Sequence, residues 1–347
     1  MGVGAHLHAA SGYSARYGAS HPSDLVKRAA ERGIGTLALT DRDTVAGTVR
    51  FAKAAAGAGV RPVFGVDVAV APVVGSGGRA APAGARPRTP ARGGAYVVEP
   101  PLRVTLLARD AAGWARLCRL VSAAHAAGAH AAGAHGGAAR AAEAPADASH
   151  AAAAAAAAIA TAASPAPALA PPPVVSWPVL ERYADQGMVV MLGPMSEPVR
   201  ALAAGRPDLA ERLLAPWREI VGPGLRLEVL WYGVPGTGPG SLRLAARTLG
   251  LADRLGIPAV LTNAVRYADP AQHRIADVLD SARLLRPIDR RRLDSGERWL
   301  KGPDAMAYAA ERIAAATGPG AGSGAASDPT RTAELLAETV RTAELCT

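Results

Sequence analysis

The chain has 347 residues, a formal net charge of +9 and a pI near 10.1. Alanine inflates its 50% hydrophobic content, so the core must rest on leucine, valine and isoleucine. Cys118 and Cys346 are too few for a disulfide framework and fit a reducing cytoplasm. No secretory leader is expected, and no apolar run reaches the ~20 residues that a membrane span needs. The charge favours polyanions, although several arginines lie in one Gly/Pro-rich stretch.

The first seventy residues alternate between short apolar runs and helical periodicity. Pro22 stands where a helix begins, and Gly33 follows where it ends. Strands are predicted over 4–8, 34–40 and 60–70, and helices over 22–32 and 44–58. This βαβα order is typical of a parallel sheet covered by helices.

Two stretches interrupt the pattern. Residues 73–95 are rich in Gly, Pro and Arg, and 126–173 form an Ala-rich low-complexity stretch with scattered histidines. We interpret both as flexible inserts, the second one unstructured or partly helical at 151–163. Between them, a strand over 102–108 and a helix over 111–124 are predicted.

The second half resumes the alternation. Strands are predicted over 188–192, 225–231 and 259–262, and helices over 197–204, 207–220, 241–255, 272–282 and 304–316. A flexible linker at 318–329 separates this barrel-like unit, residues 1–317, from a last amphipathic helix within 330–347. We expect that helix to lead into a further domain.

Polar residues follow several predicted strands. In parallel α/β folds the carboxyl ends of the strands meet on one rim, where active sites form. We therefore expect His8, Asp41, Asp67, Arg103 and the turn 263–267 to lie close together. GVPGTGPG at 233–240 lacks the Lys-Ser/Thr of a phosphate-binding loop, and we predict no catalytic residue.

Longer segments carry a resemblance to a known family. HLHAASGYSARYGAS, LALTDRD, RVTLLARDAAGWARLCRLVSAAH and TNAVRYADP resemble the PHP domain (polymerase and histidinol phosphatase) that opens bacterial DNA polymerase III alpha subunits. RYGAS, TDRD and TNAVRYADP are most similar to the error-prone, actinobacterial-type branch. The resemblance implies an α/β fold, a PHP-type distorted (β/α)7 barrel. It also implies roles in DNA replication, repair and translesion synthesis, with the polymerase core or other repair–replication subunits, and DNA, as partners.

In the resembled family polymerase chemistry lies beyond the PHP domain, so we expect that this chain does not extend DNA by itself. Such domains bind metal ions at the rim, and the resemblance places their ligands at positions that have changed here. Of these positions, His8 and Asp67 still offer donors, as a vestigial metal site. The ligand positions at Ala10 and Ala264 are lost, and arginine stands at Arg42, Arg103 and Arg266.

The replacement by arginine suggests a hypothesis. Guanidinium groups could supply the positive charge that metal ions give the rim, by pairing with Asp41, Asp43 and Asp67. The same arginines could instead hold a phosphate or pyrophosphate, or could point to solvent. We expect a structural PHP domain without a cofactor. Two alternatives stay open: a phosphoesterase or exonuclease with a reduced site for a divalent metal, and a basic DNA-binding module.

Overall fold

The computed structural model describes residues 4–73, 102–141, 173–290, 293–317 and 328–347. The predicted inserts and linker lie largely outside these ranges, except where noted below. Within them, no helix combines the length and the apolar character that crossing a membrane requires.

Seven strands form one sheet in sequential order, β1 to β7. They are β1 (Gly4–His6), β2 (Ile34–Leu39), β3 (Arg61–Ala69), β4 (Arg103–Ala108), β5 (Met188–Leu192), β6 (Leu225–Leu230) and β7 (Ala259–Thr262). Just beyond β1 and β7, Ala9 and Val265 form a parallel bridge, so the sheet nearly closes. The expected distorted (β/α)7 barrel is confirmed.

The parallel pairing expected for the first three strands is observed, but the sheet as a whole is not parallel, because β4 is reversed. This strand runs antiparallel to both β3 and β5, whereas the other neighbouring pairs are parallel. A parallel crossover usually needs a covering helix, and the sequence between β3 and β4 carries Gly, Pro and Arg in place of a helical pattern. The reversal brings the amino end of β4, at Arg103, to the rim formed by the carboxyl ends of its neighbours.

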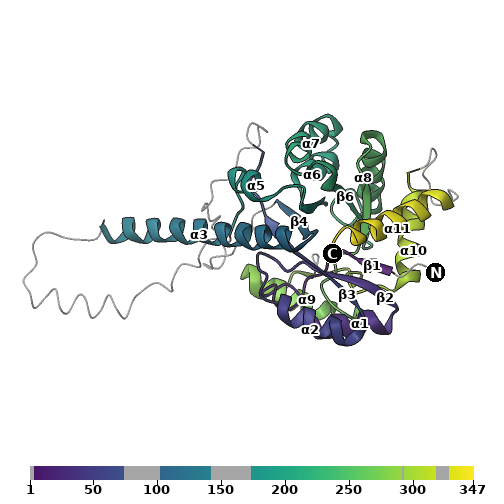
Figure 1. Cartoon of the computed structure of the whole chain (residues 1–347), viewed down its shortest axis with the longest axis horizontal. Coiled ribbons are helices and arrows are strands. Elements are labelled where there is room, and N and C mark those ends of the chain that lie inside the picture. Colours follow the sequence, from purple (N-terminus) through teal and green to yellow (C-terminus); the bar gives the residue numbers. More distant parts are fainter. Residues whose placement is uncertain (1–3, 74–101, 142–172, 291–292, 318–327) are drawn as a thin grey trace, which may run out of the picture.

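Helices surround the barrel (Figure 1). They are α1 (Pro22–Glu31), α2 (Thr48–Ala58), α3 (Ala111–Ala141), α5 (Trp177–Tyr183), α6 (Glu197–Ala203), α7 (Pro207–Val221), α8 (Leu242–Leu255), α9 (His273–Leu284), α10 (Pro303–Ala315) and α11 (Pro329–Glu344), with short 3₁₀ turns at Gly222–Gly224 and Pro270–Gln272. Their ends follow local rules: Ser241 caps α8 by accepting from the Leu244 N–H at 3.2 Å, and Gly256 ends it in the left-handed region.

Helix α3 is longer than predicted. The sequence indicated a helix ending at 124 and an unstructured insert from 126, but α3 continues to Ala141 and projects away from the barrel (Figure 1). Alanine has the highest helix propensity, so a run of it can extend a helix that packing has already started. Residues 142–172 lie outside the described ranges.

The barrel interior is filled by small and branched side chains, and the C-terminal residues complete it. Leu7, Ala38, Val63, Leu107, Val189, Met191 and Val260 pack there together with Ala343 and Cys346. The terminal helix, whose partner the sequence left open, lies against this barrel. Helix α11 packs on β7, and Thr339 accepts a hydrogen bond from the Leu261 N–H at 2.9 Å.

Candidate functional site at the barrel mouth

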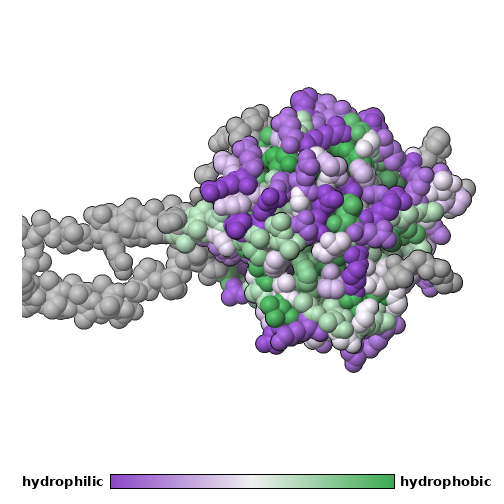
Figure 2. Space-filling view, viewed as in Figure 1, coloured by the Kyte–Doolittle hydropathy of each residue, from purple (hydrophilic) through white to green (hydrophobic). Residues whose placement is uncertain are grey.

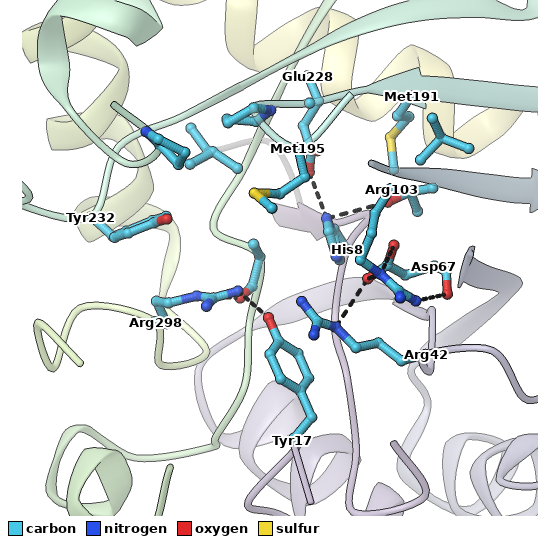
Figure 3. Close-up of a pocket in the computed structure, with 17 residues that line it drawn as sticks. His8, Tyr17, Arg42, Asp67, Arg103, Met191, Met195, Glu228, Tyr232 and Arg298 are labelled. Atoms are coloured by element: carbon cyan, nitrogen blue, oxygen red, sulfur yellow. Dashed lines mark hydrogen bonds and ion pairs between the residues drawn. The ribbon is translucent and has the colours of Figure 1, made fainter. Parts of the chain in front are cut away.

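A small pocket opens at the rim where the carboxyl ends of β2, β3 and β6 meet the amino end of β4. Its volume is about 100 Å³. Figure 3 shows that its polar side chains come from strands and loops far apart in the sequence and point toward a shared centre. They are His8, Tyr17, Arg42, Asp67, Arg103, Thr105, Glu228, Tyr232 and Arg298.

Asp67, at the mouth end of β3, is bound by two arginines. Arg103 Nε lies 3.1 Å from both carboxylate oxygens, and Arg42 Nε lies 3.3 Å from Oδ2. Arg103 Nη2 also lies 3.1 Å from Asp43 Oδ1. Burial alone would raise the pKa of Asp67, but Arg103 and Arg42 outweigh it and hold that pKa below its ordinary value. Asp67 is therefore a carboxylate engaged by guanidinium groups.

Asp41 does not pair with an arginine, contrary to the hypothesis. It is buried and accepts hydrogen bonds from the Ser11 N–H at 2.6 Å and from the Ser14 hydroxyl at 2.7 Å. Burial raises its pKa, against the effect of these serine donors. Its role in this geometry is to hold the loop that follows β1, which includes the buried Ala10.

His8 follows β1 and contacts Glu228 in β6. His8 Nδ1 lies 2.7 Å from Glu228 Oε1, and the Thr262 hydroxyl donates to the same oxygen at 2.5 Å. Burial opposes protonation of His8, yet Glu228 raises its pKa above the ordinary value. The sequence prediction did not include Glu228 in the site. A charged residue inside the apolar strand LRLEVL was the available signal, because a buried acid needs a partner.

Tyr17 stands at the centre of a group of arginines. The guanidinium carbons of Arg42, Arg266 and Arg298 lie 3.4, 4.1 and 5.6 Å from its ring centroid, and Arg298 Nη2 donates to its hydroxyl at 2.6 Å. Burial would raise the pKa of Tyr17, but these cations, Arg298 foremost, lower it to about 7. Tyr17 can therefore act as a negative charge near neutral pH.

Arg266 pairs with acids other than the expected ones. Its Nη2 lies 2.8 Å from Asp280 Oδ1 and its Nη1 lies 3.3 Å from Asp294 Oδ2, and it also donates to the Tyr17 carbonyl. The predicted pairing with Asp41, Asp43 or Asp67 was wrong because α9 and the segment after it supply nearer carboxylates. Ala264, two residues earlier, has a left-handed backbone with φ of 41°.

The donors that a metal ion would need are committed elsewhere. The Asp67 carboxylate is held by Arg103 and Arg42, and His8 Nδ1 by Glu228. In the part of the chain that the structure describes, no three His, Cys, Asp or Glu side chains are grouped as metal ligands would be. These residues do not fit a metal centre, and their guanidinium groups suit ion pairing and anion binding instead.

Comparisons with known proteins identify the family. The family model described as "PHP domain" matches residues 6–230. The error-prone DNA polymerase of Mycobacterium tuberculosis H37Rv is 32% identical over 298 residues, which are 85% of this chain and 21% of that protein. The DNA polymerase III subunit alpha of Xylella fastidiosa Temecula1 is 26% identical over 288 residues, 82% of this chain and 18% of that one.

A solved amidohydrolase from Chromobacterium violaceum is 22% identical, with a TM-score of 0.41 over 75% of this chain and 86% of that one. The chain spans about a fifth of the length of the polymerase relatives it matches. The family model covers well over half of the chain, and the relatives that share most of its length are alpha-type polymerases. The chain therefore belongs to the PHP domain family, in a form related to those of error-prone DNA polymerases.

Proposed function

We propose that this chain is a catalytically silent PHP domain of an error-prone DNA polymerase alpha subunit, with a structural role beside the polymerase core in repair and translesion synthesis. The similarity over 85% of the chain to error-prone polymerases supports the assignment to that enzyme class. The partner in this proposal is the polymerase core or another replication–repair subunit, in the cytoplasm.

The single observation that supports a role without catalysis is that two arginines already bind the Asp67 carboxylate. Arg103 and Arg42 both contact its carboxylate, at distances of 3.1 and 3.3 Å. A metal ion at this place would have to displace buried guanidinium groups and would lie beside their positive charge. That cost makes the arginine–carboxylate pairs the more stable arrangement and leaves hydrolysis without its metal-activated water.

The test combines elemental analysis with a hydrolysis assay. The full chain, purified without chelators, is measured for zinc, manganese and iron and assayed on a phosphodiester substrate with each metal added. We expect well under one metal ion per chain and no turnover above background. His8→Ala and Asp67→Asn variants serve as controls, because activity that survives both substitutions comes from a contaminant. Stoichiometric metal with turnover lost in both variants would contradict the proposal.

A further inference from the structure

Arg298 differs from the other arginines at the mouth. Its Nε donates to the Ala264 carbonyl at 3.1 Å and its Nη2 to the Tyr17 hydroxyl at 2.6 Å. Within the described ranges no carboxylate lies close enough to Arg298 to form an ion pair, whereas Arg42, Arg103 and Arg266 each have one. Its anionic partner near neutral pH is the Tyr17 phenolate, so an added anion would compete with that phenolate for Arg298.

The surroundings of Arg298 are arranged for a small ligand. Arg298 and Arg42 reach over Tyr17 from opposite sides, with their guanidinium groups directed toward the same space (Figure 3). Both line the pocket of about 100 Å³. Pockets for drug-sized ligands usually exceed ~300 Å³, so this one has room for a group of a few heavy atoms. The carboxylates on the far wall, Asp67 and Glu228, are already engaged by neighbouring donors.

We propose that the mouth pocket is a metal-independent site for a single phosphate group, which Arg298 and Arg42 bind from opposite sides. The forked N–H donors of arginine match the spacing of phosphoryl oxygens. The ligand is either free phosphate or a terminal phosphate on a longer molecule. A barrel held by its arginine–carboxylate pairs keeps its structural role whether or not phosphate binds, so the two proposals fail separately.

Tyr17 makes the site measurable. The arginines that would bind phosphate also stabilise the Tyr17 phenolate, whose pKa is about 7. Two anions that share the same cations must weaken each other, and this coupling is reciprocal. Phosphate should therefore raise the pKa of Tyr17 and remove phenolate. Burial raises the pKa of Tyr232 and Tyr267, so neither contributes phenolate near neutral pH.

The experiment titrates the full chain with inorganic phosphate at one pH unit above the Tyr17 pKa of about 7, with chloride of equal ionic strength as reference. The near-ultraviolet absorbance of phenolate and the heat of binding are followed together. We expect a saturable loss of phenolate signal. The signal should be absent in Tyr17→Phe, which still binds phosphate at least as tightly by calorimetry. Arg298→Gln should weaken binding roughly tenfold or more.

Matched variants guard against unfolding and nonspecific charge effects. Arg247→Gln removes an exposed arginine on α8 and should leave phosphate affinity unchanged. Arg298→Lys retains the charge and should bind phosphate more tightly than Arg298→Gln. If Arg298→Gln is poorly folded, the phosphate affinity of Arg298→Lys is compared with that of wild type instead and should be lower. Binding that is equal in wild type and all Arg298 variants, or no saturable binding beyond the chloride reference, would overturn the proposal.

Competition distinguishes the two sources of phosphate. A short 5′-phosphorylated oligonucleotide that displaces inorganic phosphate would identify a chain end as a ligand, and its failure to compete would leave free phosphate. Either result supports a site for one phosphate group. Equal displacement by the same oligonucleotide without its 5′-phosphate would contradict such a site.

Discussion

Asp67 and Tyr17 organise the charges of the mouth in different ways. Asp67 is a permanent acid between Arg103 and Arg42, and its lowered pKa reflects those contacts. Tyr17 is negatively charged only above neutral pH, because its pKa is about 7. The mouth thus has fixed ion pairs on one wall and a titratable group on the other.

Removal of Arg266 tests how far the fixed pairs stabilise the fold. This buried side chain contacts Asp280, Asp294 and the Tyr17 carbonyl, so Arg266→Ala removes the guanidinium that pairs with the buried Asp294 carboxylate. We expect a loss of about 3–5 kcal/mol in the free energy of unfolding, measured by denaturant titration. Arg247→Ala, at an exposed position, should change it by less than about 0.5 kcal/mol. Equal small effects in both variants would remove support for a structural role of the arginines.

The pH dependence of stability reports the charge on Tyr17. Its pKa is about 7 in the folded chain and ~10 when unfolded, so its ionisation stabilises the fold above pH 7 and that contribution is lost as the pH falls through 7. One unit above 7 the contribution is about 1.4 kcal/mol. The difference in unfolding free energy between wild type and Tyr17→Phe should therefore grow from pH 6 to pH 8. A constant difference over that range would show that Tyr17 stays neutral.

For single residues, the sequence predicted part of the site. Because Asp67, Arg42 and Arg103 lie at the ends of neighbouring predicted strands, which share a rim, they were expected to lie together. Arg298 and Asp294 could not be predicted, since they reach the mouth through a return of the chain after α9 that has no periodic pattern. Their contacts depend on tertiary packing, as Tyr267 and Trp299 show by bridging that segment to the strand region.

Among the elements, β4 departed most from the predicted pattern, and α11 followed it. Hydrophobic periodicity located β4 correctly but carries no information on strand direction, which depends on how the chain returns to the sheet. For α11 the amphipathic pattern predicted a helix with an apolar face and left its partner open. The structure supplies that partner, since Leu335 packs with Val229 of β6, Leu261 of β7 and apolar side chains of α8 and α10.

Helix α11 should contribute directly to the stability of the barrel. Leu335→Ala would leave a cavity against β6 and β7 and is expected to reduce the free energy of unfolding by about 2–5 kcal/mol. Glu334→Ala, on the exposed face of the same helix, tests for a change in helix propensity alone and should have an effect below about 0.5 kcal/mol. If both variants unfold like the wild type, α11 does not pack as described.

For the whole molecule, the resemblance predicted the fold, whereas the compartment and the polyanion partner inferred from composition stay predictions. Net charge alone does not identify a binding surface. On the face shown in Figure 2, strongly hydrophobic residues form small separate patches among hydrophilic ones. The described exposed hydrophobic side chains include Ile275 and Val278 on α9, and nothing in their surroundings identifies what would cover them. The mouth is therefore the feature with the clearest chemistry.

The central claim is that guanidinium–carboxylate pairs, in place of metal ions, hold the mouth together. Its most direct test is equilibrium unfolding of the full chain after chelation and with added zinc or manganese, compared with His8→Ala. For each of the two proteins, we predict that the unfolding free energy with chelator and with added metal agrees within about 0.5 kcal/mol. A stabilisation that grows by about 1.4 kcal/mol for each tenfold rise in metal concentration, and that disappears in His8→Ala, would contradict the account.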